Sequence, residues 1–397
     1  MTLTLTARYS RLSHELKLFI FASLTMGIAY SFVDSTLNNF LNDRFTLSGF
    51  ERSFLELPRE LPGLLVVFTS AALFFLCSRR LGVVAMLLGL AGALLIGFAT
   101  STYLVLTLCL FVYSMGQHLF MPASSAIGME LAEPGKIGAR LGQLNAVRNV
   151  AAIFGSFVVF LGFKYLGFSY QTTFTLSAIG FGVAAVLMYM MKPGQPTPSK
   201  TFLKLRKEYR LFYALNILYG SRKQLFITFA PWVIVNVFQQ PTQTLATLMT
   251  IGGIIGILFQ PLLGWVTDHW GERFVLASEA VLLVVVCLGY GFSKFIFSTD
   301  TAFLLICIFY LIDQMLMSVG MARSMYMKKI ALAPEDVQAA LTAGVTMDHV
   351  FSMSVALLGG VIWSVFGFQY VFLMGVGIAL INFFVAMQVR VPKSAAA

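Results

Sequence analysis

The stretch Gly167-Phe168-Ser169-Tyr170 recurs 200 residues later as Gly367-Phe368-Gln369-Tyr370. The same gapless register extends upstream and pairs Pro134 with Pro334, Ala139 with Ala339, and Val150 with Val350. A second register, offset by 193 residues, aligns Glu15, Leu18, Phe19 and Gly27 with Glu208, Leu211, Phe212 and Gly220. Because both registers join the same two halves in the same order, the chain is predicted to be a duplicated unit.

The composition places both copies in a lipid bilayer. Hydrophobic residues make up 58% of the chain, charged residues 11%, and the mean hydropathy is +0.84. A helix needs about 20 apolar residues to cross about 30 Å of hydrocarbon. The sequence offers twelve such stretches, near 17–41, 53–77, 82–101, 103–130, 140–163, 169–191, 209–238, 243–266, 274–293, 302–327, 340–363 and 369–389. We therefore predict an all-α integral membrane protein with twelve transmembrane helices in two pseudo-symmetric six-helix bundles.

The loops define the domain organisation. A connection rich in proline and lysine separates the two copies, and it predicts an N-terminal bundle at 1–191, a cytoplasmic linker at 192–208 and a C-terminal bundle at 209–397. The other loops are mostly too short for a soluble catalytic domain. The chemistry is therefore expected within the membrane.

The basic residues indicate the orientation. Segments on the side of the N-terminus hold 18 lysines and arginines, the opposite side holds four, and five lie within predicted spans. Because cytoplasmic loops carry the excess of positive charge, both termini are expected in the cytoplasm of a bacterial cell, with the chain in its cytoplasmic (inner) membrane. The net charge of +10 thus reflects topology and does not indicate nucleic acid as a partner.

Charged residues within the predicted spans are expensive and are functional candidates by default. The basic ones are Arg59, Arg148, Arg222, Lys223 and Arg323, and the acidic ones are Asp34, Glu56, Glu60, Asp313 and Asp348, with Glu279 nearer a helix end. Two adjacent cations, Arg222 and Lys223, predict a site for an anionic substrate, or alternatively structural pairing with Asp34 or Asp313. The same two aspartates are proton-coupling candidates, or else fixed counter-ions.

Further polar residues complete the candidate site. Tyr30 and Asn38 share one stripe of their helix with Asp34, and His118 and Gln314 are added as cavity residues. Arg148 and Asp348 occupy equivalent repeat positions with opposite charge, which predicts a gating pair across the cavity, with independent local partners as the alternative. Near Pro58 and Pro62, Arg59 and Glu60 predict a hinge.

The loop Gly264-Trp265-Val266-Thr267-Asp268-His269-Trp270-Gly271-Glu272-Arg273 resembles the cytoplasmic signature of the major facilitator superfamily. Gly264, Asp268, Gly271 and Arg273 match the signature, whereas His269 and Glu272 replace basic residues. The resemblance implies a turn that latches the two halves in one conformation, and it implies that helices 3, 6, 9 and 12 face lipid while the other helices line a central cavity. The equivalent N-terminal loop has Arg79 where a carboxylate is expected.

Together these features predict a secondary active transporter that moves a small organic solute by alternating access. We expect the solute to be anionic, the transport to be proton-coupled and the protein to be monomeric, with no cofactor and no metal site. Efflux of amphipathic drugs or lipids is an alternative, and a receptor or scaffold with the same fold is an alternative of another class. No nucleophile with a nearby base appears in the sequence, so an enzyme is not predicted.

Overall fold

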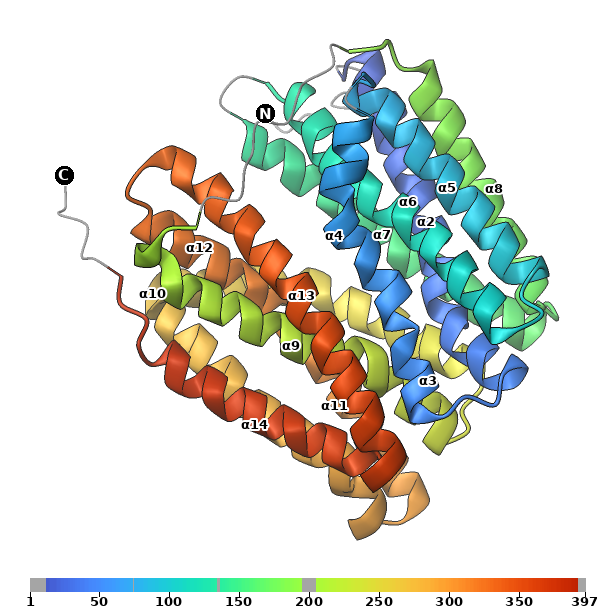
Figure 1. Ribbon diagram of the computed structural model, residues 1–397, viewed down its shortest axis with the longest axis vertical. Helices are drawn as coiled ribbons and strands as arrows, with labels where there is room; N and C mark the ends of the chain where they lie inside the picture. The colour runs from blue at the N-terminus through green and yellow to red at the C-terminus, as the bar shows by residue number, and fades with distance from the viewer. Residues whose placement is uncertain (1–11, 74, 134–135, 195–204, 392–397) are drawn as a thin grey trace, which may run out of the picture. The chain divides into compact units, whose positions relative to one another are not determined.

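The computed structural model describes residues 12–73, 75–133, 136–194 and 205–391 (Figure 1). The elements of the first half are α2 (His14–Arg44), α3 (Gly49–Phe54), α4 (Glu56–Ala72), α5 (Ser78–Phe98), α6 (Tyr103–Glu130), α7 (Ile137–Tyr165) and α8 (Tyr170–Met190). Those of the second half are η1 (Lys207–Tyr209), α9 (Arg210–Trp232), η2 (Val233–Val237), α10 (Thr242–Ile296), α11 (Thr299–Leu316), η3 (Met317–Val319), α12 (Gly320–Ile330), α13 (Pro334–Phe366) and α14 (Phe368–Ala386). The all-α architecture is confirmed.

Nine helices of the described residues are long and apolar enough to cross a membrane. The 55-residue α10 contains two predicted spans, and Gly271 separates them with a φ of 82° inside the helix. The helices α4 and α9 are not among the nine, and both carry charges within their spans. With α10 counted twice, and with α4, α9–η2 and α11–α12 each taken as one span, the twelve predicted spans are all accounted for.

The chain forms two compact units. The N-terminal unit comprises Met1–Leu37 and Leu65–Ser199, and the C-terminal unit comprises Asn38–Leu64 and Lys200–Ala397. The end of α2, the whole of α3 and the start of α4 thus belong with the second half of the sequence, although they precede the predicted linker by more than a hundred residues. Most of the predicted linker, 195–204, lies outside the described residues.

The second predicted span, near 53–77, starts at a break between two helices. It begins at the end of α3, before α4 starts at Glu56. The α3 helix starts at a capping box, in which the Ser48 hydroxyl accepts a hydrogen bond from the Glu51 amide and the Glu51 carboxylate accepts one from the Ser48 amide. It ends at Leu55, because Pro58 has no N–H to donate to the carbonyl of Phe54. The break lies just before the predicted Arg59–Glu60 hinge, which itself falls within α4 and stays a prediction.

In the N-terminal unit, small residues and hydroxyls pack α2 against α7 and α8. A Cβ on Gly27 would lie 2.7 Å from the Ala151 Cβ, so the two helices touch at that point. The Ser31 hydroxyl lies 2.8 Å from the Ser156 hydroxyl, which joins α2 to α7. The ring of Tyr30 packs edge-on against Phe181 of α8. Close approach of small residues is a usual way to pack membrane helices.

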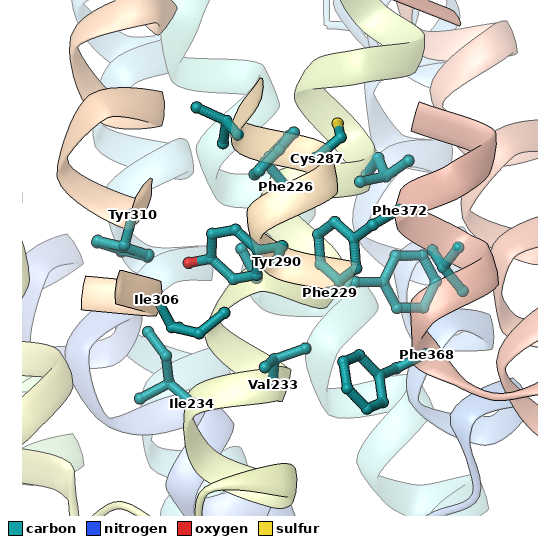
Figure 2. Packing of buried hydrophobic residues seen from close by; sticks show 14 of the residues in the cluster. Phe226, Phe229, Val233, Ile234, Cys287, Tyr290, Ile306, Tyr310, Phe368 and Phe372 are labelled. Carbon is teal, nitrogen blue, oxygen red and sulfur yellow. The ribbon is translucent and has the colours of Figure 1, made fainter. Parts of the chain in front are cut away.

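In the C-terminal unit, a large aromatic and aliphatic cluster joins α9, α10, α11 and α14 (Figure 2). Tyr290 stacks on Phe372 with ring centroids 4.8 Å apart, and Phe226 meets both rings edge-on. Gly375 admits the thiol of Cys287, because a Cβ there would lie 2.8 Å from its Sγ. The buried thiol thus packs as a small apolar residue.

The sequence repeat is visible in the backbone. Gly167 and Gly367, the equivalent turn glycines, end α7 and α13 with φ values of 65° and 108°. Only glycine adopts such angles without strain, which explains why the turn recurs. Gly27 and Gly220 also correspond, because a Cβ on Gly220 would overlap the Asp348 Oδ1 of α13, as Gly27 approaches α7 in the N-terminal unit.

Candidate functional site

Three consecutive polar side chains of α9 bind three different parts of the C-terminal unit. Arg222 donates to Asp313 of α11, Lys223 donates to Asp348 of α13, and Gln224 donates to Glu56 of α4. Successive helical residues point about 100° apart, so three in a row reach three neighbours. The middle of α9 is therefore the polar centre of this unit.

Arg222 belongs to a closed network of two arginines and two carboxylates. Its guanidinium lies 2.6 Å from the Asp313 carboxylate and 3.3 Å from that of Glu279, which also accepts from Arg323 at 3.3 Å. No side chain of the four is more than 5% exposed. The charges balance within the network, so the structural-pairing alternative for Arg222 and Asp313 is the arrangement observed. Burial without such pairing would be strongly unfavourable.

Tyr219 lies beside both arginines of this network. The Arg323 guanidinium is 3.6 Å from the centroid of its ring, and the Tyr219 hydroxyl donates to the Met317 carbonyl. A guanidinium over an aromatic face gains electrostatic stabilisation that is largest away from water. The ring thus supports the network from the side of α9.

Lys223 takes part in a second, more accessible cluster. Its Nζ lies 2.7 Å from the Asp348 carboxylate, and these side chains are 19% and 13% exposed. The Ser352 hydroxyl donates to the same carboxylate at 2.9 Å. On the next residue of α13, the His349 Nδ1 lies 2.6 Å from the Glu60 carboxylate of α4. This second cluster consists of Lys223, Asp348, Ser352, His349 and Glu60, and it differs from the first in that the side chains of its ion pairs are 11–19% exposed.

A third cluster surrounds Glu56. Its carboxylate accepts from Arg52 at 2.7 Å, from Arg59 at 2.9 Å and from the Gln224 amide at 3.1 Å. Arg52 in turn donates to the Asn38 side-chain oxygen. Arg52, Glu56 and Gln224 are all buried. The count of basic residues places Arg52 outside the membrane, and the sequence predicts a contact of Arg59 with Glu60 or Asp34. The structure shows Glu56 as one partner of Arg59, and a contact of Arg59 with Glu60 or Asp34 stays a prediction.

In the N-terminal unit the predicted residues are spread over several helices. Arg148 of α7 donates to Ser124 of α6 at 3.3 Å and to Asn145 of its own helix. The His118 Nδ1 lies 3.0 Å from the Ser114 hydroxyl, one turn earlier on α6. Asp34 is exposed, and the Tyr30 hydroxyl is buried. Arg148 and Asp348 thus each have partners within their own unit, and the gating pair stays a prediction.

The signature loop uses a different carboxylate from the expected one. Gly271 makes the turn with its positive φ, as the glycine signature predicts. Asp268 is exposed, and within the described residues it has no ion pair. Glu272, which replaces a basic signature residue, is buried and forms an ion pair with Lys329 of α12, with its carboxylate oxygen 2.5 Å from the Lys329 Nζ. Arg273 is exposed and contacts the sulfur of Met387.

The corresponding N-terminal loop has the opposite charge pattern. Arg79 donates to Glu15 of α2 at 2.7 Å, to Glu130 of α6 at 2.6 Å and to the Lys192 carbonyl after α8 at 2.7 Å. One buried guanidinium thus joins the ends of three helices. The arginine in place of the signature carboxylate is accommodated because its partners are acidic.

The structure brings together Lys223 and Asp348, Arg222 and Asp313, and Glu60 with His349. Gln314 instead packs at Gly252 of α10, where an added Cβ would lie 3.5 Å from the Gln314 Cβ. Beyond the residues to which the sequence assigns a specific site role, the clusters contain Glu56, Glu279, Arg323, Tyr219, Gln224, Arg52, His349 and Ser352. The first three carried a signal, because all are charges within or near predicted spans. For Tyr219 and Gln224, the only signal in the sequence was their position beside Arg222 and Lys223 on the same helix.

A family model described as the Major Facilitator Superfamily matches residues 19–327 and 212–397. No curated protein sequence matches the chain. Among solved structures, the nucleoside transporter NupG is similar with a TM-score of 0.75 and 14% identity, over 95% of this chain and 98% of that one. An auto-inhibited POT family peptide transporter is similar with a TM-score of 0.73 and 11% identity, over 97% of this chain and 99% of that one. At these identities the likeness concerns the fold.

Proposed function

The chain belongs to the Major Facilitator Superfamily, and from that premise we propose that it moves a small organic anion across the membrane together with protons, by alternating access. The family and the fold support a secondary transporter in a membrane. The nature of the solute and the coupling are argued below from the polar clusters of the C-terminal unit.

The observation that carries the proposal is the accessible Lys223–Asp348 pair, one residue along α9 from the enclosed Arg222 network. Lys223 is the 14th of 23 residues in α9, about 20 Å from the start of the helix at 1.5 Å per residue. A cation at that depth, partly exposed, is placed to receive an anion near the middle of the bilayer, where transporters of this type bind their substrates.

The anionic preference rests on Lys223 rather than on Arg222. Arg222 and Arg323 face two carboxylates, so their network has no net charge to offer a solute. Among the described residues, Lys223 has one ion-paired carboxylate, and its side chain is partly accessible. An anion that approaches it exchanges one ion pair for another instead of entering a saturated network.

Proton coupling requires a carboxylate whose protonation differs between the two transport states. Of the predicted candidates, Asp34 is exposed, whereas Asp313 lies in a buried ion pair with Arg222. We therefore retain Asp34 as a coupling residue and assign Asp313 a structural role. The cytoplasmic location of both termini, the bacterial inner membrane and the monomeric state are part of the same proposal, and the distribution of basic residues supports the orientation.

The test is solute flux into proteoliposomes that contain the purified protein. An inward proton gradient is imposed, an internal dye reports pH, and the outer medium contains radiolabelled gluconate, lactate, glutamate, uridine, glucose or a lipophilic amine. We expect an organic acid to accumulate with protons, and we expect Lys223→Ala to abolish that accumulation. Asp300→Asn, which changes an exposed carboxylate at the start of α11, is the matched control and should retain it.

Two outcomes contradict the proposal in different ways. Extrusion of the lipophilic amine without movement of any acid would favour efflux of amphipathic compounds. Saturable binding of a solute by folded protein, without movement of the solute or of protons, would favour a receptor.

A further inference from the structure

We propose that Arg148 of α7 and the Tyr30 hydroxyl of α2 bind an anionic oxygen group of the transported solute, a carboxylate or a phosphate, within the N-terminal unit. The inference rests on the proposed function and adds an anion-binding site in this unit to Lys223 in the C-terminal unit. It gives Arg148 a binding role, where the sequence predicts gating, and it makes the predicted cavity residue Tyr30 a solute ligand.

The first argument is that Arg148 lacks a carboxylate partner. Its guanidinium donates to the Ser124 hydroxyl of α6 at 3.3 Å and to the Asn145 side-chain oxygen, and both acceptors are neutral. Within the described part of the chain Arg148 forms no ion pair. A cation at membrane depth without a counter-charge is unfavourable. The other cations that the sequence places within spans each bind a carboxylate; they are Arg59, Arg222, Lys223 and Arg323.

The carboxylates of the N-terminal unit do not supply the missing charge. The acidic residues of this unit are Glu15, Asp34, Glu130 and Glu133. Glu15 and Glu130 bind Arg79, and Glu133 binds Lys136. Asp34 acts electrostatically on Tyr30, and within the described residues it forms no ion pair with Arg148. An anionic solute brings the counter-charge that Arg148 lacks.

The second argument is that the Tyr30 hydroxyl lacks a hydrogen-bond partner among the described residues, although its oxygen is buried. Its ring packs edge-on against Phe181 of α8 and Tyr113 of α6, with centroid distances of 4.8 and 5.9 Å, so the ring is fixed. A buried hydroxyl without a partner is unfavourable. Tyr30 and Arg148 act on one another electrostatically, so one acceptor can satisfy both.

The chemistry of these two groups selects an oxygen anion. The Arg148 guanidinium keeps further N–H donors after those that bind Ser124 and Asn145, and the Tyr30 hydroxyl adds an O–H donor. A carboxylate or a phosphate has several oxygens that accept from such a planar fork at once. A cationic solute would be repelled by Arg148. The site therefore takes an anion.

The third argument is that a solute can reach this part of α7. Arg148 lies eight residues past Arg140, where the membrane span of α7 begins, or about 12 Å along the helix axis. Beside it, Asn145 and Asn149 are exposed and Arg148 itself is half-buried. Exposed amides and a guanidinium are unfavourable against hydrocarbon. This face of α7 therefore lines an aqueous path.

The experiment measures equilibrium binding of radiolabelled anions to the purified protein in detergent. The probes are gluconate, lactate and glutamate, which carry carboxylates, and glycerol 3-phosphate, which carries a phosphate. Arg148→Gln should weaken binding of the preferred anion by about a hundredfold. Its melting temperature should be no lower than that of the wild type, because no carboxylate loses a partner. The preference of the wild type for carboxylates or for phosphate assigns the group that the site recognises.

Three further variants separate binding from structure. Tyr30→Phe keeps the ring packing and should weaken binding by about tenfold. Arg148→Lys keeps the charge without the planar fork, so its affinity should lie between those of Arg148→Gln and the wild type. Lys164→Gln is the matched control, because it makes the same change of charge at an exposed residue near the end of α7 and should bind like the wild type.

The outcomes separate the inference from the proposed function. Wild-type affinity in Arg148→Gln would overturn the anion site and leave anion transport standing. A melting temperature of Arg148→Gln far below that of the wild type, with unchanged affinity in Tyr30→Phe, would also overturn it, because Arg148 would then have a structural role. Wild-type protein that moves uridine or the lipophilic amine but no acid would refute the proposed function, and the anion site with it.

Discussion

In both units two helices approach closely at a glycine, but the polar contacts beside that glycine differ. In the N-terminal unit the middle of α2 meets α7 through Gly27 and a hydrogen bond between Ser31 and Ser156. In the C-terminal unit the equivalent helix, α9, meets α13 through Gly220 and the Lys223–Asp348 ion pair. The backbone approach is shared, and the polar contact is not. The contacts of α2 with α7 at Gly27 and Ser31 are thus neutral, whereas those of α9 with α13 include an ion pair.

At the signature loops the two units are alike except in sign. Arg79 binds Glu130 at the end of α6, and Glu272 binds Lys329 at the end of α12. Each loop is thus tied to the end of another helix by an ion pair, with the charges reversed. A comparison of the two loops by the sign of their charges would miss this likeness. The contacts of the two loops reveal it.

The largest expected effect is the loss of Arg222. Arg222→Met leaves Asp313 and Glu279 buried with Arg323 as the remaining cation of the network, and removing one partner of a buried ion pair costs about 3–5 kcal/mol. We expect a large fall in the melting temperature in detergent and a poor yield of folded protein. The double variant Arg222→Met/Asp313→Leu should recover part of the loss. A single variant as stable as the wild type would show that the network is not structural.

Substitutions at Gly27 and Gly220 test whether the close approach of the helices matters equally in the two units. Gly220→Ala adds a Cβ that overlaps the Asp348 Oδ1 and lies 2.9 Å from the Asp348 Cα, so α9 and α13 must separate and the ion pair must shift. Gly27→Ala meets the Ala151 Cβ at 2.7 Å, where no charge is involved. Both substitutions overpack, at about 1–3 kcal/mol each. We expect only Gly220→Ala to lower transport by more than about tenfold, with flux and melting temperature measured side by side. Equal loss of transport in both would contradict the difference between the units.

Loss of the ion pairs at the signature loop and at the corresponding N-terminal loop should destabilise the protein less. Arg79→Met removes hydrogen bonds to two carboxylates, but Glu130 is 46% exposed, so water takes over part of the interaction. We expect destabilisation of about 1–2 kcal/mol for Arg79→Met and a similar value for Glu272→Gln. Asp268→Asn is the matched control, because this exposed carboxylate has no ion pair within the described part of the chain. Thermal unfolding of the three variants decides whether Glu272, and not Asp268, is the carboxylate that stabilises the loop. Destabilisation by Asp268→Asn alone would refute this role of Glu272.

The sequence predicts the helices and the repeat well because both depend on local pattern. Apolar length defines the spans, and the turn glycines Gly167 and Gly367 recur because their positive φ demands glycine. The partners of the buried charges were less predictable. Charge counting suggested internal pairing, but which acid meets Arg222 or Lys223 depends on the rotation and tilt of each helix. Those follow from packing over the whole bundle, such as the close approach of Gly220 to α13.

The division of the chain was the least predictable feature from sequence. The segment 38–64 belongs with the C-terminal unit, although periodicity and loop length gave no sign of it. Its residues are held by groups far along the chain: the Asn39 amide donates to the Gln240 carbonyl, and the Phe50 amide donates to the Ser364 hydroxyl. Such contacts arise from tertiary structure alone.

The smallest expected effect concerns the capping box at the start of α3, within this segment. Hydrogen bonds from the Ser48 amide and hydroxyl hold the pKa of Glu51 below its ordinary value of 4.5. Because the folded-state pKa is depressed, the associated stability is present above pH 4.5 and is lost as the pH falls below it. Ser48→Ala removes the cap at a cost of about 0.5–1 kcal/mol near neutral pH.

The gap in melting temperature between Ser48→Ala and the wild type should therefore be widest near neutral pH and should narrow as the medium is acidified. Arg44→Ala, which changes an exposed residue at the end of α2, is the control and should show a pH-independent difference. If the gap for Ser48→Ala stays constant down to pH values well below 4.5, the Ser48 hydroxyl acts only through the Glu51 amide, and the carboxylate takes no part in holding α3 in place.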